Sequence, residues 1–240
     1  MSGCNMTSKW SAKLWLPVAV LVAVAAHAAD PQEVWEQAIK AKGGRERLRA
    51  VHSLAIYLKP AQGLLAGPPT TWLCVFPDRY FEFEGGLAGR SRAIVVDGTA
   101  DRVAMDVTGQ PRGARHLGQM ELDRFTWNQI VFLLESAWLQ PQPVETRRNA
   151  VTVQAGGRTF QVFLNHANLP ERIVSKHAYD YRLQHYREFD GVWLPASVTS
   201  SDGMRQWTWD ADYEMDAKYN PKLFERMPDL ADGPEPWRKR

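Results

Sequence analysis

The order of apolar and polar residues after position 28 first predicts a helix. Val34, Trp35 and Ile39 recur at helical spacing, so that one face of the segment is apolar. Asp30 can cap the start of this helix, and the pair Gly43-Gly44 ends it. A second, shorter helix is expected at residues 45–50.

From residue 54 onward the period changes to two, which indicates β-strands. Strands are expected at residues 54–58, 72–76, 80–84, 94–96, 103–107, 151–153, 160–164, 173–179, 183–189, 192–199 and 205–215. Tight-turn signals such as Asp97-Gly98 and Asp190-Gly191 separate several of them, as in antiparallel hairpins. The segment 205–215 would span about 35 Å, longer than the usual strand, which suits a strongly curved sheet.

One long helix is expected between the two groups of strands, at residues 121–139. Residues 130–134 are consecutively apolar, so this helix is apolar nearly all the way round. Such a helix is buried on more than one side. We therefore expect an α+β fold, in which helices cover the concave apolar face of a curved, half-barrel antiparallel sheet of roughly ten strands.

The first 28 residues have the order of a secretory signal peptide. Lys9 and Lys13 precede an apolar run at residues 14–26, and Ala26-His27-Ala28 closes it with small residues at the cleavage positions. The run is short for a membrane span, which needs about 20 apolar residues, although an uncleaved anchor is the alternative. We expect residues 1–28 to be removed near Ala28, residues 29–228 to form one domain in an exported compartment, and residues 229–240 to form a polar tail.

Charge and cysteine content narrow the class of protein. The full chain has a net charge of +2, and without the two lysines of the signal peptide the basic and acidic residues balance. A neutral protein lacks the basic surface that nucleic acid requires, so no nucleic-acid partner is expected. Only Cys74 remains in the mature chain, so no disulfide framework can form, and we expect a monomer with an ordinary core.

Motifs for catalysis or metal binding are not found in the sequence. The histidines lack the spacing of a zinc site, and Cys74 alternates with Trp72 and Phe76 as a core residue does. The acidic row from Asp210 to Asp216 follows an extended strand, where carboxylates do not converge on one ion. We expect no enzyme, no metal and no cofactor; a secreted hydrolase, with His177 and His185 as the pair to inspect, is the least favoured alternative.

Aromatic residues are the remaining candidates for function. Those predicted on the inner face or the covering helix, and hence as ligand-binding, are Trp72, Phe76, Phe81, Phe83, Phe132, Phe160, Trp207, Trp209 and Tyr213. They could simply fill a core. A strongly curved sheet could instead leave an apolar cavity that receives a hydrophobic ligand, and the pattern leaves both interpretations open.

Three segments of the chain resemble the periplasmic LolA/LolB-like family of outer-membrane lipoprotein-sorting proteins. They are the helix-to-strand junction at residues 41–53, the paired strand–turn segments at residues 76–81 and 93–98, and the segment 186–195 with Asn220, Phe224 and Pro228. The last is the most specific of the three.

The resemblance implies a half-barrel sheet lidded by helices that enclose a cavity for acyl chains. It implies non-covalent binding and transfer of lipids or lipidated proteins, with transient contact with a membrane. An envelope-stress sensor or regulatory module that binds an envelope protein is the alternative within the same fold.

Overall fold

The computed structural model describes residues 29–61, 67–85, 91–97, 100–106, 111–115, 119–175, 180–201, 204–225, 234–235 and 237, and the side chains of these except at 100–125. The helices are α1 (Pro31–Lys42), α2 (Arg45–Arg49), α3 (Gln119–Leu133) and a short 3-10 helix, η2 (Pro221–Phe224). The strands are β1 (Ser53–Pro60), β2 (Thr70–Val75), β3 (Arg79–Glu84), β4 (Arg92–Asp97), β5 (Ala100–Asp106), β6 (Pro111–Arg115), β7 (Gln142–Arg147), β8 (Ala150–Ala155), β9 (Arg158–Leu164), β10 (Pro170–Ser175), β11 (Asp180–Phe189), β12 (Val192–Ser201) and β13 (Gln206–Met215). The expected signal peptide lies outside the described residues.

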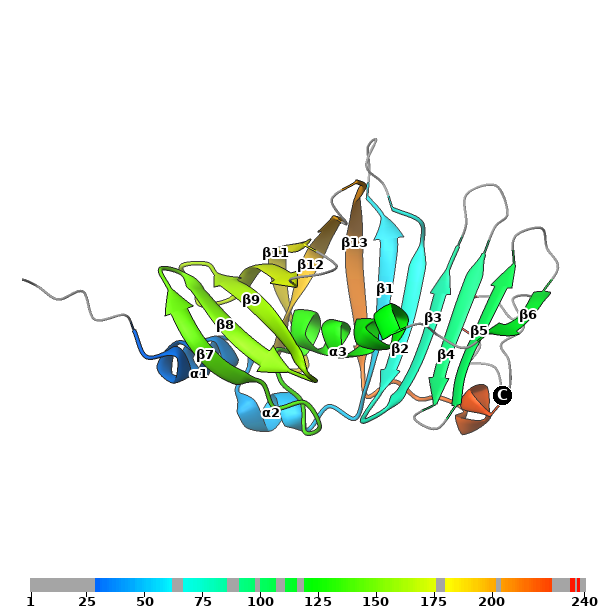
Figure 1. Ribbon diagram of the computed structural model, residues 1–240, viewed down its shortest axis with the longest axis horizontal. Coiled ribbons are helices and arrows are strands. Elements are labelled where there is room, and N and C mark those ends of the chain that lie inside the picture. The colour runs from blue at the N-terminus through cyan, green and yellow to red at the C-terminus, as the bar shows by residue number, and fades with distance from the viewer. Residues whose placement is uncertain are drawn as a thin grey trace, which may run out of the picture.

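Within the described part of the chain, thirteen strands form one open antiparallel sheet (Figure 1). Its order is β6-β5-β4-β3-β2-β1-β13-β12-β11-β10-β9-β8-β7. Consecutive strands are therefore neighbours except β6 and β7, which lie at the two edges, and the first strand, β1, pairs with the last, β13. The antiparallel sheet predicted from the sequence is confirmed. Strand β6 was not predicted, because Pro111 and Gly113 disfavour a strand in the interior of a sheet. In the structure β6 lies at the edge of the sheet, where both residues are tolerated.

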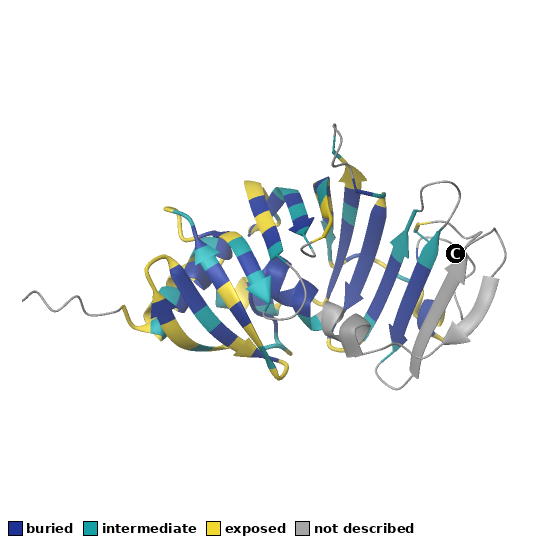
Figure 2. Cartoon of the chain, turned by 45° about the horizontal axis from the view of Figure 1, so that its top comes forward, coloured by how far each residue is buried: buried dark blue, intermediate teal, exposed yellow. Residues whose placement is uncertain are grey.

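Strands β1 to β4 carry apolar side chains on both faces. In β2, Trp72 and Cys74 belong to one buried cluster, and Leu73 and Val75 belong to a second cluster on the opposite face. Figure 2 shows these central strands as buried along most of their length. Residues near the C-terminus cover the second face, and Trp237, expected in a solvated tail, is buried there with its ring 5.5 Å from that of Phe81.

The sheet curves around α3. Trp127 and Phe132 of this helix contact β9 and β2 respectively, with ring centroids 5.3 Å from Phe160 and 5.8 Å from Trp72. Five strands lie between β2 and β9, so a flat sheet would separate them by about 29 Å. The two helical residues are only about 7.5 Å apart along the helix axis. Both contacts therefore require a bent sheet, and we call the side that contacts α3 the concave face.

Helix α3 is shorter at its C-terminal end than the sequence predicts. It ends at Leu133, whereas the absence of Gly and Pro suggested a helix as far as residue 139. Leu134 has a φ of 64°, in the left-handed region that stops a helix. Its amide still donates to the carbonyl of Ile130, and Ser136 then organises the turn by accepting from the amide of Leu139.

The junction between α1 and α2 docks on the hairpin between β11 and β12. A side chain at Gly43 would place its Cβ 2.2 Å from the carbonyl oxygen of Gly191, so only glycine allows this approach. Arg47 donates from Nε to the carbonyl of Asp190 in the same turn. Lys42 is fully buried at this junction, with Nζ 5.3 Å from the centre of the Tyr186 ring and without a hydrogen-bond partner in the described part of the chain.

No helix among the described residues is long and apolar enough to cross a membrane.

Replacement of Lys42 tests the cost of this buried amine. Burial lowers the pKa of Lys42 from 10.5 to about 7. The unfolded chain therefore binds more protons than the folded one between these two values, and the stability of the protein rises with pH through that window. We expect Lys42→Met to raise the free energy of unfolding at pH 7 and below, with the gain shrinking toward pH 10.5, as measured by urea denaturation at several pH values. A gain that does not change with pH would contradict the buried, titrating amine.

Candidate functional site

The candidate site is the concave face, where most of the predicted ligand-binding residues lie. Trp72, Phe76, Phe132, Phe160, Trp209 and Tyr213 belong to its buried cluster, and Trp207 packs against that cluster while partly exposed. Phe81 and Phe83 are on the opposite face, with Leu73 and Phe224, so their predicted placement is wrong. In β3 the apolar side chains point away from α3, and the concave face carries Tyr80 and Glu82 instead.

Aromatic rings on the concave face contact one another through α3. The ring of Phe132 lies 5.8 Å from that of Trp72 and 5.8 Å from that of Tyr213. Trp127 lies 5.3 Å from both Phe160 and Tyr181, two contacts that the sequence did not single out. Residues 130–134 of the chain have no exposed surface, so the helix itself fills the space between these rings.

Trp209 is held at one end of the concave face by the segment that precedes β2. Its Nε1 donates to the carbonyl of Pro68 over 2.8 Å. A Cβ at Gly67 would lie 2.2 Å from the indole ring, which shows how closely the backbone covers it. This tryptophan is therefore fixed by the protein's own chain.

A buried polar cluster interrupts the apolar concave face beneath α3. It comprises Tyr80, Glu82, Arg92 and Asn128. Glu82 is 1% exposed, accepts from the hydroxyl of Tyr80 over 2.6 Å and pairs with Arg92 over 2.6 Å. Asn128 donates from Nδ2 to the Tyr80 hydroxyl over 3.2 Å.

Two polar atoms at this interface have no partner among the described residues. They are Oδ1 of Asn128 and Nε1 of Trp72, which stands opposite Glu82 in the pairing of β2 with β3. Leaving a buried polar atom unpaired costs roughly 1–3 kcal/mol. The contact between α3 and this part of the sheet is thus less favourable than an entirely apolar one.

Cys74 and Tyr213 are buried groups without nucleophilic character. Burial, with a smaller contribution from Glu82, raises the pKa of the Cys74 thiol, so the thiol stays protonated at neutral pH. Burial also raises the pKa of Tyr213, whose hydroxyl donates to the carbonyl of Pro195 over 2.7 Å. The prediction that Cys74 is a core residue is confirmed.

An ion cluster fastens the C-terminal end of α3 to the helices at the start of the chain. Glu135 is 1% exposed and accepts from Arg45 and, over 2.7 Å, from Nε of Arg49. Arg45 also pairs with Glu36 of α1 over 2.6 Å. We call Glu36, Arg45, Arg49 and Glu135 the Glu135 ion cluster. It was not foreseen, because its members lie up to 99 residues apart and show no spacing signal.

Metal ligands do not gather among the described residues, which contain no group of three or more His, Cys, Asp or Glu side chains able to hold an ion. Asp210 and Asp212 are exposed on the outer face of β13, opposite Lys59 and Tyr57 of β1. His177, one of the pair suggested for a hydrolase, lies outside the described residues.

Comparison with solved structures finds distant matches over most of the chain. A DUF1329 family protein from Desulfovibrio piger is 11% identical, with 82% of this chain and 98% of that chain covered and a TM-score of 0.47. A LolA superfamily protein from Nitrosomonas europaea is 16% identical, with 83% and 99% covered and a TM-score of 0.46. MucB, solved in complex with MucA, is 11% identical, with 80% and 81% covered and a TM-score of 0.16.

The expected LolA-like family is thus represented among the structural neighbours. No protein-family model matches the sequence, and a search of curated proteins gives no match. Because the TM-scores are below 0.5, these neighbours carry no functional argument, and the function must be inferred from this chain's own residues.

Two substitutions test how the rings pack around α3. Phe132→Ala removes a fully buried ring and should lower the free energy of unfolding by about 3–5 kcal/mol. Trp72→Phe removes the unpaired Nε1 donor together with some apolar area, so it should cost clearly less. Urea denaturation of both variants measures the difference, and a loss for Trp72→Phe as large as that for Phe132→Ala would contradict this prediction.

Proposed function

We propose that this protein is a periplasmic carrier or binding protein for lipid-like ligands, or for the acyl chains of lipidated proteins, which it binds without covalent chemistry. The ligand site would be the concave face, with Trp72, Phe76, Phe160, Trp207, Trp209 and Tyr213 as contact residues, while Phe132 belongs to the helix that the ligand would displace. Export rests on the signal-like order of residues 1–28. The protein would act as a monomer and touch a membrane only transiently.

The observation that carries the proposal is the placement of one helix between rings from both halves of a curved sheet. Phe132 contacts Trp72 of β2, and Trp127 of the same helix contacts Phe160 of β9. Without α3 these rings would line an apolar trough about 10 Å wide, the diameter of a helix. An acyl chain could replace the apolar side chains of α3 there at little cost in transfer free energy, since one apolar contact is exchanged for another.

Two features favour a helix that can leave this position. The contact with the sheet includes the unpaired atoms of Asn128 and Trp72, which lower its net stability. In addition, α3 ends in the partly exposed Glu135 ion cluster, where Arg45 is 32% and Arg49 37% exposed. Because Glu135 is 1% exposed, removing its charge leaves the two arginines without their shared acceptor and loosens this attachment of α3.

The test is uptake of a dansyl-labelled fatty acid by delipidated mature protein, followed by stopped-flow fluorescence. Wild-type protein should take up the probe, and Glu135→Gln should take it up several-fold faster because α3 is less firmly held. Glu145→Gln is the matched control, since the partner of Glu145 among the described residues is the exposed Arg147, over 2.6 Å. That control should leave both the rate and the affinity unchanged.

Absence of probe uptake, together with absence of lipid in organic extracts of the purified protein, would refute lipid binding. If the probe binds and Glu135→Gln changes only the thermal stability, lipid binding stands and the movement of α3 is wrong.

A second candidate is a regulatory module that binds an envelope protein. It is favoured by the exposure of Trp138 (55%) and Trp193 (38%), since tryptophan is enriched in protein interfaces. A defined partner retained by wild-type protein and lost with Trp138→Ser, without lipid transfer between vesicles, would support this function over transport.

A further inference from the structure

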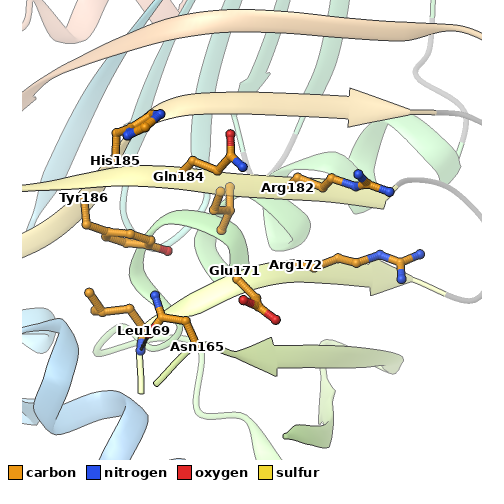
Figure 3. Close-up of a pocket in the computed structure, with 9 residues that line it drawn as sticks. Asn165, Leu169, Glu171, Arg172, Arg182, Gln184, His185 and Tyr186 are labelled. Carbon is orange, nitrogen blue, oxygen red and sulfur yellow. Dashed lines mark hydrogen bonds between the residues drawn. The ribbon is translucent and has the colours of Figure 1, made fainter. Parts of the chain in front are cut away.

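The sheet divides between β10 and β11, and a pocket lies in the division. Pairing of these strands covers only the three positions from Arg172↔Arg182 to Val174↔Asp180, although β11 continues to Phe189 beside β12. A pocket of about 470 Å³ opens where β11 leaves β10 (Figure 3). This volume lies within the range of small-molecule sites, about 300–1,000 Å³.

Two local irregularities produce this division. The register of β10 shifts between Pro170 and Arg172, so that Glu171 is left out of the ladder with β9. His185 has a φ of 55°, which is uncommon for a residue other than glycine and interrupts the alternation of β11. Tyr186 consequently turns toward the buried cluster, and its hydroxyl donates to the carbonyl of Pro170 over 2.6 Å across the gap.

Hydrogen-bond donors dominate the polar lining of the pocket. Arg172 and Arg182 stand directly opposite each other on neighbouring strands, and Figure 3 shows both side chains extending toward the same end. Like charges in this arrangement repel each other. Arg172 is neutralised by Asp180, to which Nε and Nη2 donate over 2.9 and 2.7 Å. Arg182 has no ion-pair or hydrogen-bond partner in the described part of the chain.

Two further residues set the polarity of the pocket. The side-chain oxygen of Asn165 accepts from the amides of Ala167 and Leu169, so its NH₂ group is left as a donor. The carboxylate of Glu171 is the one acidic side chain in the lining, and it accepts from Asn149, which lies outside the pocket, over 3.4 Å. Glu171 and Arg182 are thus the two charged side chains of the described lining that have no ion-pair partner among the described residues, and the guanidinium of Arg182 is the positive one.

We propose that this pocket binds a small oxyanion of the phosphate class, with Arg182 as its principal ligand. A planar guanidinium can donate two parallel hydrogen bonds to a phosphate, and the free N–H groups of Arg172 lie across the strand pair to share the charge. Leu169 and Leu183 supply apolar wall next to these donors. The anion can be free phosphate or the phosphate of a lipid headgroup, since both present the same oxygens. This site goes beyond the proposed lipid binding on the concave face.

Isothermal titration calorimetry with inorganic phosphate at low ionic strength tests the site directly. Wild-type protein should bind phosphate, and Arg182→Gln should weaken binding by roughly tenfold or more, the loss expected for a charged hydrogen-bond partner. Arg148→Gln is the matched control, because Arg148 is an exposed arginine in the turn between β7 and β8. That variant should bind phosphate like wild-type protein.

Flotation with phosphatidylcholine vesicles, with and without phosphatidylglycerol, distinguishes the source of the anion. Arg182-dependent binding to the phosphatidylglycerol vesicles alone assigns the site to a lipid headgroup, and Arg182-dependent binding of inorganic phosphate assigns it to the free ion. Either result supports the site. Failure of both probes, or equal effects of Arg182→Gln and Arg148→Gln, overturns it. Uptake of the fatty-acid probe should be unchanged in Arg182→Gln, so the two proposals fail independently.

Discussion

The structure depends on the burial of α3 inside the curve of a single sheet. Backbone hydrogen bonds define the order and register of the strands, but they do not fix how far a sheet of this width bends. The curvature is set by side chains that must lose their contact with water on both sides of one helix. Trp72 and Phe160, on strands with five others between them, reach the same helix only in the bent sheet. The Glu135 ion cluster then ties the end of that helix to α1 and α2.

Alternation in the sequence was sufficient to predict the strands and their antiparallel arrangement, because the period of two is a local property. Alternation did not show which face of a strand points toward α3 when both faces carry apolar side chains. In β3, Phe81 and Phe83 look like inner-face residues, yet the C-terminal segment with Phe224 covers them on the outer side. The burial of Trp237 likewise depends on contacts between distant segments, which no local pattern encodes. The end of α3 at Leu133 depends on the left-handed backbone of Leu134, which the local pattern also does not show.

Two of the three segments that resemble the LolA/LolB-like family, residues 41–53 and 186–195, meet at a packing junction. Gly43 touches the backbone of Gly191, and Arg47 donates to Asp190 in the same turn. Lys42 lies beneath Tyr186 in this junction. These contacts explain why two segments that lie far apart in the sequence, a helix-to-strand junction and a hairpin, both show the resemblance. For these two segments the resemblance therefore concerns how the helices pack on the sheet, whereas the segment 76–81 contributes Phe76 and Tyr80 to the concave face.

Tyr186 connects the junction, the concave face and the pocket between β10 and β11. Its ring packs against the concave-face cluster and faces Lys42, while it also lines the pocket that contains Arg182. Burial raises the pKa of its hydroxyl, which therefore stays protonated and can keep donating to Pro170. Because this hydrogen bond joins β10 to β11 across the division in the sheet, it holds the pocket at a fixed width. A change in how α1 packs on the sheet would alter the pocket through the Tyr186 ring, since Lys42 of α1 and Tyr186 are in direct contact. The left-handed conformation of His185 is the backbone feature that places Tyr186 where it can serve all three regions.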